Sequence, residues 1–257
     1  MIRVALEKIM RSGRHIFIAT AAASLFLLVQ AGVCRGAGPH RDQVAEIVAS
    51  VLKAYGGAEA VGKVISVTAK GKIAEYLNGN AGNYARYLER PRKLRIEVMP
   101  EQGGEVRILD GDRGWQVGNE GFVKVSPLEL QAMIYQYSYL DLPMAFVGGS
   151  LTARYGGREQ YREREAYLLL IELKNAPVLH ILIDAKTHLI VKVSANFALG
   201  MMGAGELSTE YHDFRPIDGV LFPHRLVNFA GGTKLSEITI DEIAINRKLP
   251  GELFAPR

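Results

Sequence analysis

The sequence has almost no cysteine: among its 257 residues, only Cys34 is present. A single thiol can form neither an intramolecular disulfide nor a cysteine-based zinc site. A mature chain that begins after residue 34 has no cysteine at all. Its stability must therefore come from a hydrophobic core.

Sequence motifs of common enzyme classes are also lacking. The chain has no GxSxG nucleophile turn, no phosphate-binding P-loop, no GxGxxG dinucleotide motif and no HExxH zinc motif. Five histidines follow the first 36 residues, and no two of them form an HxH pair: His40, His180, His188, His212 and His224. We therefore predict no catalytic residue, no metal site and no cofactor. A hydrolase whose site is assembled from distant strands remains the third hypothesis.

An excess of one charge sign is missing from most of the chain. The net charge of +4 comes from residues 1–36, which hold five basic residues and one acidic residue, so the remaining 221 positions carry 26 of each sign. Proteins that bind the phosphate backbone usually carry a strong positive charge. A nucleic-acid partner is therefore not expected.

Residues 1–36 have the pattern of a signal peptide. Four basic residues within the first 14 positions precede an uncharged run at 16–33. We expect cleavage near Gly36 and a periplasmic location. A retained anchor in the inner membrane, with the rest of the chain facing the periplasm, is the alternative. Lipidation at Cys34 is disfavoured because Val33 precedes it, where a small residue is usual.

Residues 37–257 are expected to form one domain rich in antiparallel strands. In the segment VISVTAKGKI, apolar residues alternate with polar ones, and KLRIEVM repeats this alternation with Leu94, Ile96 and Val98 on one face. Further along the chain, Leu179, Ile181 and Ile183 are expected to face Leu189, Val191 and Val193 across a short turn. Helical patterns occur only at 42–55 and 126–147, the second beginning with a capping box at Ser126 and Glu129. The fold class we predict is mainly β (α+β): a large curved antiparallel sheet that forms an unclosed barrel, with an N-terminal helix and a helical lid.

Three stretches carry a resemblance to a known family: AYGGAEAVGKVISVTAKGKI, ILIDAKTHLIVKV, and YHDFRPIDGVLFPHRL followed by ITIDEIAINRKLPGELFAPR. Together they resemble uncharacterised secreted members of the outer-membrane lipoprotein carrier (LolA/LolB-like) superfamily. The resemblance implies an unclosed barrel, lidded by helices, whose apolar concavity receives acyl chains in the periplasm. No matching motif locates the arginine that the lipoprotein carriers use in lid closure.

The function that we predict is shielding of lipid or lipoprotein acyl chains, in outer-membrane lipoprotein or lipid sorting. Exposure of a 16-carbon chain to water costs about 12 kcal/mol, so transfer across an aqueous compartment needs a shielding cavity. The predicted lining residues are Ile65, Val67, Leu94, Ile96, Val98, Trp115, Met133, Ile134, Tyr137, Met144, Phe146, Leu179 and Ile181, and Met201 and Met202 are predicted in a gate loop. For each of these residues, a place in an ordinary filled core is the alternative.

The second functional hypothesis is a lipid or lipoprotein sensor, or an interaction module, of the same fold. An inner- or outer-membrane protein is then a further class of partner, and a monomer is expected in either case. The histidine-containing stretch YHDFRPIDGVLFPHRL is predicted to be a two-residue hairpin turn at Asp218-Gly219. This register places Asp213 opposite His224, a stabilising cross-strand pair, and favours no catalysis.

Overall fold

The computed structural model describes residues 39–100, 104–118, 121–149, 151–198 and 204–256. Two helices lead into the sheet, α2 (Pro39–Ala54) and α3 (Ala58–Gly62). A longer helix, α4 (Pro127–Leu140), and the short 3-10 helix η2 (Met144–Phe146) divide the strands into two groups, and η4 (Gly251–Phe254) follows the last strand. None of the helices in these ranges is long and apolar enough to cross a membrane.

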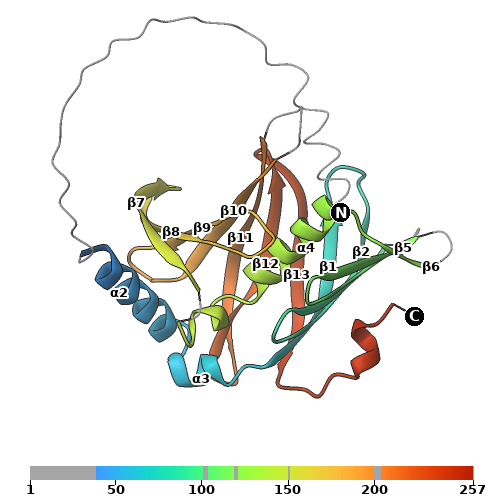
Figure 1. The fold of residues 1–257 in the computed structure, drawn as a ribbon, viewed down its shortest axis with the longest axis horizontal. Coiled ribbons are helices and arrows are strands. Elements are labelled where there is room, and N and C mark those ends of the chain that lie inside the picture. The colour runs from blue at the N-terminus through green and yellow to red at the C-terminus, as the bar shows by residue number, and fades with distance from the viewer. Residues whose placement is uncertain (1–38, 101–103, 119–120, 150, 199–203, 257) are drawn as a thin grey trace, which may run out of the picture.

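The described strands form one thirteen-stranded antiparallel sheet with two free edges (Figure 1). Its spatial order is β6-β5-β4-β3-β2-β1-β13-β12-β11-β10-β9-β8-β7, so β6 and β7 are the edges. The strands are β1 (Ser66–Glu75), β2 (Ala81–Glu89), β3 (Lys93–Pro100), β4 (Glu105–Asp110), β5 (Arg113–Gly118), β6 (Gly121–Lys124), β7 (Ala153–Tyr161), β8 (Arg164–Ile171), β9 (Leu179–Asp184), β10 (Ile190–Ala198), β11 (Ala204–Ile217), β12 (Val220–Ala230) and β13 (Thr233–Ile245). The predicted fold class is confirmed.

The sheet joins its two halves through the pairing of β1 with β13. Both halves are meanders because each strand pairs with its chain neighbours, and only the β1–β13 ladder is formed by strands far apart in sequence. The sheet curls, and α4 runs across its concave side (Figure 1). One large hydrophobic core lies between the helix and the sheet.

Helix α4 begins where the sequence predicts it. The Ser126 side chain accepts from the Glu129 backbone N–H at 3.3 Å, and the Glu129 carboxylate accepts from the Ser126 N–H at 2.9 Å. Pro127 occupies the first helical position, where no intrahelical N–H bond is lost. All six positions from Ala132 to Tyr137 are buried. Because six consecutive residues cover the full circumference of a helix, the concave sheet and its flanking segments enclose this part of α4.

The C-terminal end of α4 is fixed by an ion pair with the β2–β3 turn. Asp141 caps the helix, and its Oδ1 lies 2.9 Å from Nε of Arg90, at an angle that does not make a hydrogen bond. A second Arg90 nitrogen donates to the Met144 carbonyl at 3.3 Å. Arg90 therefore holds both α4 and η2 against the sheet.

The end of α2 packs against the β11–β12 hairpin, and both segments belong to the stretches that carry the family resemblance. Tyr55, at the end of α2, accepts a backbone bond from Leu221 and packs its ring edge-on against Phe214, with 5.9 Å between centroids. Gly56 follows with φ of +118°, and a Cβ at this position would lie 2.0 Å from the carbonyl oxygen of Gly219. Only glycine permits this approach of the helix end to the β11–β12 turn.

We predict that Gly56→Ala destabilises the protein more than Gly57→Ala does. Both glycines have a positive φ, which costs an alanine about 1–3 kcal/mol. Only Gly56 faces a backbone oxygen, whereas nothing lies within 4 Å of a Cβ at Gly57, so the clash adds about 1–3 kcal/mol at Gly56 alone. Denaturant unfolding of both variants measures the difference, and equal losses would contradict the close approach.

The pKa of Asp141 predicts a pH dependence of stability. Burial raises this pKa from its ordinary value of 3.8 to about 6, although Arg90 opposes the shift. The folded state therefore binds the proton more readily, and the stabilising contribution is complete below about pH 4 and lost as pH rises through about 6. We expect Asp141→Asn to remove this fall, which is on the order of 2–3 kcal/mol, from the free energy of unfolding measured between pH 4 and pH 7.

Asp213→Asn is the control for this measurement. Asp213 is exposed, and its hydrogen bond to Arg215 lowers its pKa, which is the opposite direction. This substitution is expected to leave the fall in the free energy of unfolding between pH 4 and pH 7 in place. If the Asp141→Asn protein kept the same fall as the unsubstituted protein, Asp141 would not be its source.

Candidate functional site

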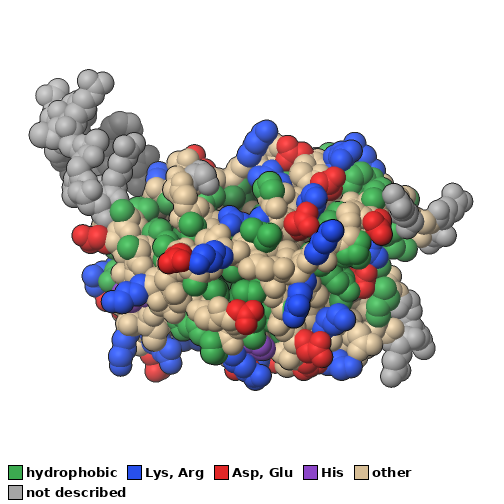
Figure 2. Space-filling view, turned by 90° about the horizontal axis from the view of Figure 1, so that it is seen from below, with side chains coloured by type: hydrophobic (Ala, Val, Ile, Leu, Met, Phe, Trp, Pro, Cys, Tyr) green, Lys and Arg blue, Asp and Glu red, His purple; other side chains and the backbone are tan. Residues whose placement is uncertain are grey.

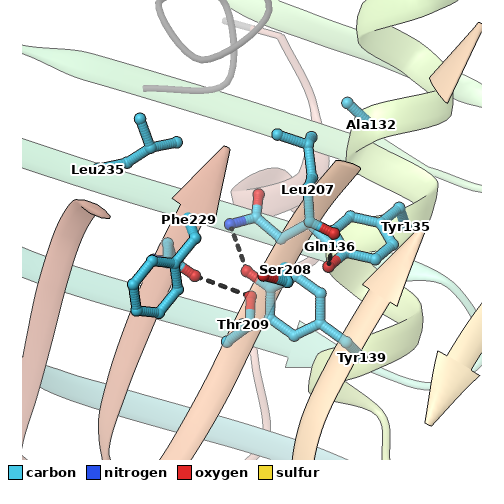
Figure 3. A pocket seen from close by; sticks show the side chains of 10 residues that line it. Ala132, Tyr135, Gln136, Tyr139, Leu207, Ser208, Thr209, Phe229 and Leu235 are labelled. Carbon is cyan, nitrogen blue, oxygen red and sulfur yellow. Dashed lines mark hydrogen bonds between the residues drawn. The ribbon is translucent and has the colours of Figure 1, made fainter. Parts of the chain in front are cut away.

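A narrow pocket of about 40 Å³ lies between α4 and strands β11 to β13 (Figure 3). Helix α4 contributes one wall and the three strands contribute the other. The lining residues are Ala132, Tyr135, Gln136, Tyr139, Leu207, Ser208, Thr209, Asn228, Phe229 and Leu235. This volume is far below the 300–1,000 Å³ that ligand pockets usually have. An apolar surface with a few polar groups is the usual composition of such a site.

Tyrosines of α4 attach the helix to the sheet beside this pocket. The hydroxyl of Tyr135 lies 3.3 Å from the carbonyl of Val193 and 3.2 Å from that of Leu207, and it donates to these backbone oxygens. In return, Tyr211 of β11 donates to the carbonyl of Tyr139 at 3.0 Å. Burial raises the pKa of Tyr135, Tyr139 and Tyr211, so all three remain neutral near pH 7.

A second pocket, of about 250 Å³, lies at the C-terminal end of α4. Its walls include the β2–β3 turn at residues 90–92, the end of α4 at residues 137–142, and Ile171 and Leu179 from β8 and β9. The Arg90–Asp141 ion pair belongs to this wall. Open space therefore remains both beside α4 and at its end, and the helix itself fills the centre of the concave face.

Two buried arginines lie on the concave face among the apolar residues. Arg86 of β2 and Arg107 of β4 are 4% and 3% exposed, and both are directly opposite Ile96 of the intervening strand β3. The sequence prediction missed them. Their signal was present in the alternation, because Arg86 lies two positions from both Tyr84 and Leu88, which are buried on the same face.

Arg107 connects the sheet to the pocket. Its Nη1 donates to Oε1 of Gln136 at 3.1 Å, and Nε2 of Gln136 donates to the hydroxyl of Tyr139 at 3.4 Å. Figure 3 shows Gln136 and Tyr139 on the helix side of the pocket. The polar groups of the pocket are thus continuous with the arginine.

Most residues predicted to line a cavity are buried at the helix–sheet core. They are Val67, Leu94, Ile96, Val98, Met133, Ile134, Tyr137, Met144, Phe146, Leu179 and Ile181. Tyr137 and Leu179 border the larger pocket, and none of the eleven borders the smaller one. Their role in ligand binding stays a prediction.

Two predicted lining residues do not lie on the concave face. Ile65 is 62% exposed because β1 begins one residue later, and the Ile65 backbone instead bonds with Asn246 and Arg90 at the sheet margin. Trp115 is opposite Ile108 on the convex face, where Phe254 of η4 covers this small apolar cluster. The sequence does not show that η4 returns to this side of the sheet. The predicted gate residues Met201 and Met202 lie outside the described residues.

The β11–β12 hairpin has most of its predicted register. Ile217 pairs with Val220 and Tyr211 with Leu226, whereas Asp213 and His224 fall between two ladder pairs. Asp213 has φ of +54° and bonds to Arg215, while His224 is buried with Nδ1 3.1 Å from the Phe222 carbonyl. The described residues contain no group of three or more His, Cys, Asp or Glu side chains placed to hold a metal ion.

Charges of both signs are mixed over the face seen in Figure 2. Lysine and arginine side chains alternate there with aspartate and glutamate, and apolar side chains are scattered between them. This distribution is consistent with the balanced charge of residues 37–257.

Comparisons with known proteins show similarity in fold. No family model and no curated protein matches the sequence. A Vibrio parahaemolyticus domain named for outer-membrane lipoprotein sorting is 11% identical with a TM-score of 0.52, over 82% of this chain and 95% of that one. A DUF1329 family protein from Desulfovibrio piger is 9% identical with a TM-score of 0.54, over 82% and 96%. A LolA superfamily protein from Nitrosomonas europaea is 13% identical with a TM-score of 0.49, over 80% and 96%. The likeness is one of fold: the unclosed antiparallel sheet that the predicted resemblance implies is shared with the lipoprotein-sorting domain and the DUF1329 family protein.

Proposed function

We propose that the protein binds lipid or lipoprotein acyl chains in the periplasm and shields them from water during sorting to the outer membrane. The observation that carries this proposal is the covering of a long apolar concave sheet by one helix, α4, with open pockets beside it and at its end. The likeness of fold to a domain named for outer-membrane lipoprotein sorting supports the same function. A signal peptide at residues 1–36 is part of the proposal.

The way in which α4 is attached supports binding with movement of this helix. Side-chain contacts connect it to the strands, among them the Tyr135 bonds and the Arg90–Asp141 ion pair. No strand ladder holds it, so α4 can shift while the β1–β13 ladder and its neighbours remain paired. A chain longer than the present pocket accommodates then lies between the shifted α4 and the apolar residues of the sheet.

We expect Ala132→Phe to weaken acyl binding. Ala132 is fully buried on α4 and borders the smaller pocket, so a phenyl ring there occupies the space that an acyl chain would take. The affinity for a neutral diacylglycerol with one fluorescent acyl chain should fall at least tenfold, as measured by fluorescence titration. Gln131→Phe is the matched control because residue 131 is adjacent on α4 and borders neither pocket; its affinity should stay within about twofold.

The thermal unfolding temperature of both variants shows whether weaker binding comes from a filled pocket or from a damaged fold. A filled pocket leaves the variant folded at the temperature of the titration. The proposed function would be wrong if the unsubstituted protein neither retained lipid through purification, by mass spectrometry of an organic extract, nor took up the neutral probe. Unchanged affinity in the Ala132→Phe protein would place acyl binding elsewhere than this pocket.

A further inference from the structure

The two concave-face arginines have more positive charge than the described residues around them neutralise. Glu105 forms an ion pair with Arg107, with Oε1 2.8 Å from Nε. No carboxylate in the described part of the chain forms an ion pair with Arg86. The pair of guanidinium groups with this single carboxylate leaves one net positive charge in the interior, where an unneutralised charge is unfavourable.

Individual hydrogen-bond donors of these arginines are also without acceptors. Nε of Arg86 and Nη2 of Arg107 are buried and have no hydrogen-bond partner among the described residues, and Nε of Arg107 lies close to Glu105 without the angle of a hydrogen bond. Buried polar groups in native proteins nearly always have partners. Two buried guanidinium groups with unpaired N–H donors therefore point to an anionic acceptor supplied from outside the chain.

The sheet register places the two arginines on the same face. Arg86 pairs with Ile96, and Ile96 pairs with Arg107, so the arginines are two strands apart at the same level of the sheet. Two strand spacings are about 10 Å, a distance that two extended arginine side chains can close. Guanidinium groups bind carboxylate and phosphate oxygens through paired N–H donors.

The arginines lie close to the pocket beside α4. Gln136 borders that pocket and accepts from Arg107. Burial raises the pKa of Tyr139, another pocket residue, while the positive charges of Arg107 and Arg86 act in the opposite direction. Likewise, burial raises the pKa of Tyr84 to about 12 against the same two charges. The electrostatic field of both arginines therefore reaches the Tyr139 hydroxyl at the pocket.

We propose that Arg86 and Arg107 bind the single anionic group, a carboxylate or a phosphate, of an acyl ligand whose chain lies along the apolar wall at Ala132, Leu207 and Leu235. This inference rests on the proposed function and adds the chemical class of ligand. A monoanion neutralises the remaining positive charge and supplies acceptors for the orphaned N–H groups. The ligand thus enters with its charged group toward β2–β4 and its chain between α4 and β11–β13.

The test uses three ligands with the same 16-carbon chain: palmitate, hexadecyl phosphate and the neutral hexadecanol. Each displaces the fluorescent diacylglycerol from the purified protein, at concentrations below those at which the ligand aggregates. We expect at least one of the two anionic ligands to bind tenfold or more tightly than hexadecanol. The stronger of the two anions identifies the headgroup as a carboxylate or a phosphate.

Substitutions then locate the effect. Arg86→Gln and Arg107→Gln should each lower the affinity for the preferred anionic ligand toward the affinity for hexadecanol. The affinity for hexadecanol itself should change little. Arg95→Gln is the control, because Arg95 lies on the convex face of β3, paired with Glu97, and should keep the full preference.

The outcomes separate this inference from the proposed function. Equal affinities of the unsubstituted protein for all three ligands would overturn the anion site while acyl binding stands, and this comparison needs no variant to fold. If the unsubstituted protein bound none of the three ligands and did not bind the neutral probe, both the anion site and the proposed function would be overturned. An anion preference that survives in folded Arg86→Gln and Arg107→Gln proteins would also overturn the assignment to these two residues.

Discussion

The exclusion of water from one face of a large curved sheet is the constraint on which the rest of the structure depends. Strands β1 to β4 and β8 to β13 present apolar side chains to the concave side, and the sheet does not close on itself to bury them. Helix α4 therefore has to lie inside the curl, and its sequence suits that position because it is buried on all sides between Ala132 and Tyr137. The ion pair at Asp141, the capping box at Ser126 and the tyrosine hydroxyl bonds all act on this one helix.

The same constraint supports the proposed place of the ligand on the concave face. A sheet that covers its apolar face with strands would have to break ladder hydrogen bonds to open, whereas a helix held by side chains leaves the ladders intact. The pockets beside α4 and at its end show that the helix does not fill the whole concavity. The two buried arginines give one side of the concavity a chemical preference that a purely aliphatic surface would lack.

The alternation of apolar and polar residues predicted the fold well in regular strands and helices, where the backbone repeat fixes the direction of each side chain. The alternation in β3 identified Leu94, Ile96 and Val98 as buried, and the Ser126 cap identified the start of α4. The prediction failed where one residue changes the register. A bulge between Ile190 and Lys192 buries Ile190 and leaves Leu189 and Val191 half-exposed, contrary to the expected pairing across the β9–β10 turn.

The sequence by itself determined the strand-rich class, the position of the lidding helix and the family resemblance, because these depend on residue spacing and local caps. Only the tertiary structure decided which face each side chain meets. Trp115 looks like any core tryptophan until η4 covers the convex face, and Arg86 looks like a surface charge until its strand pairs with β1 and β3 and its side chain is buried. Burial and unpaired charge are properties of neighbours far apart in the chain, and a one-dimensional pattern does not contain those neighbours.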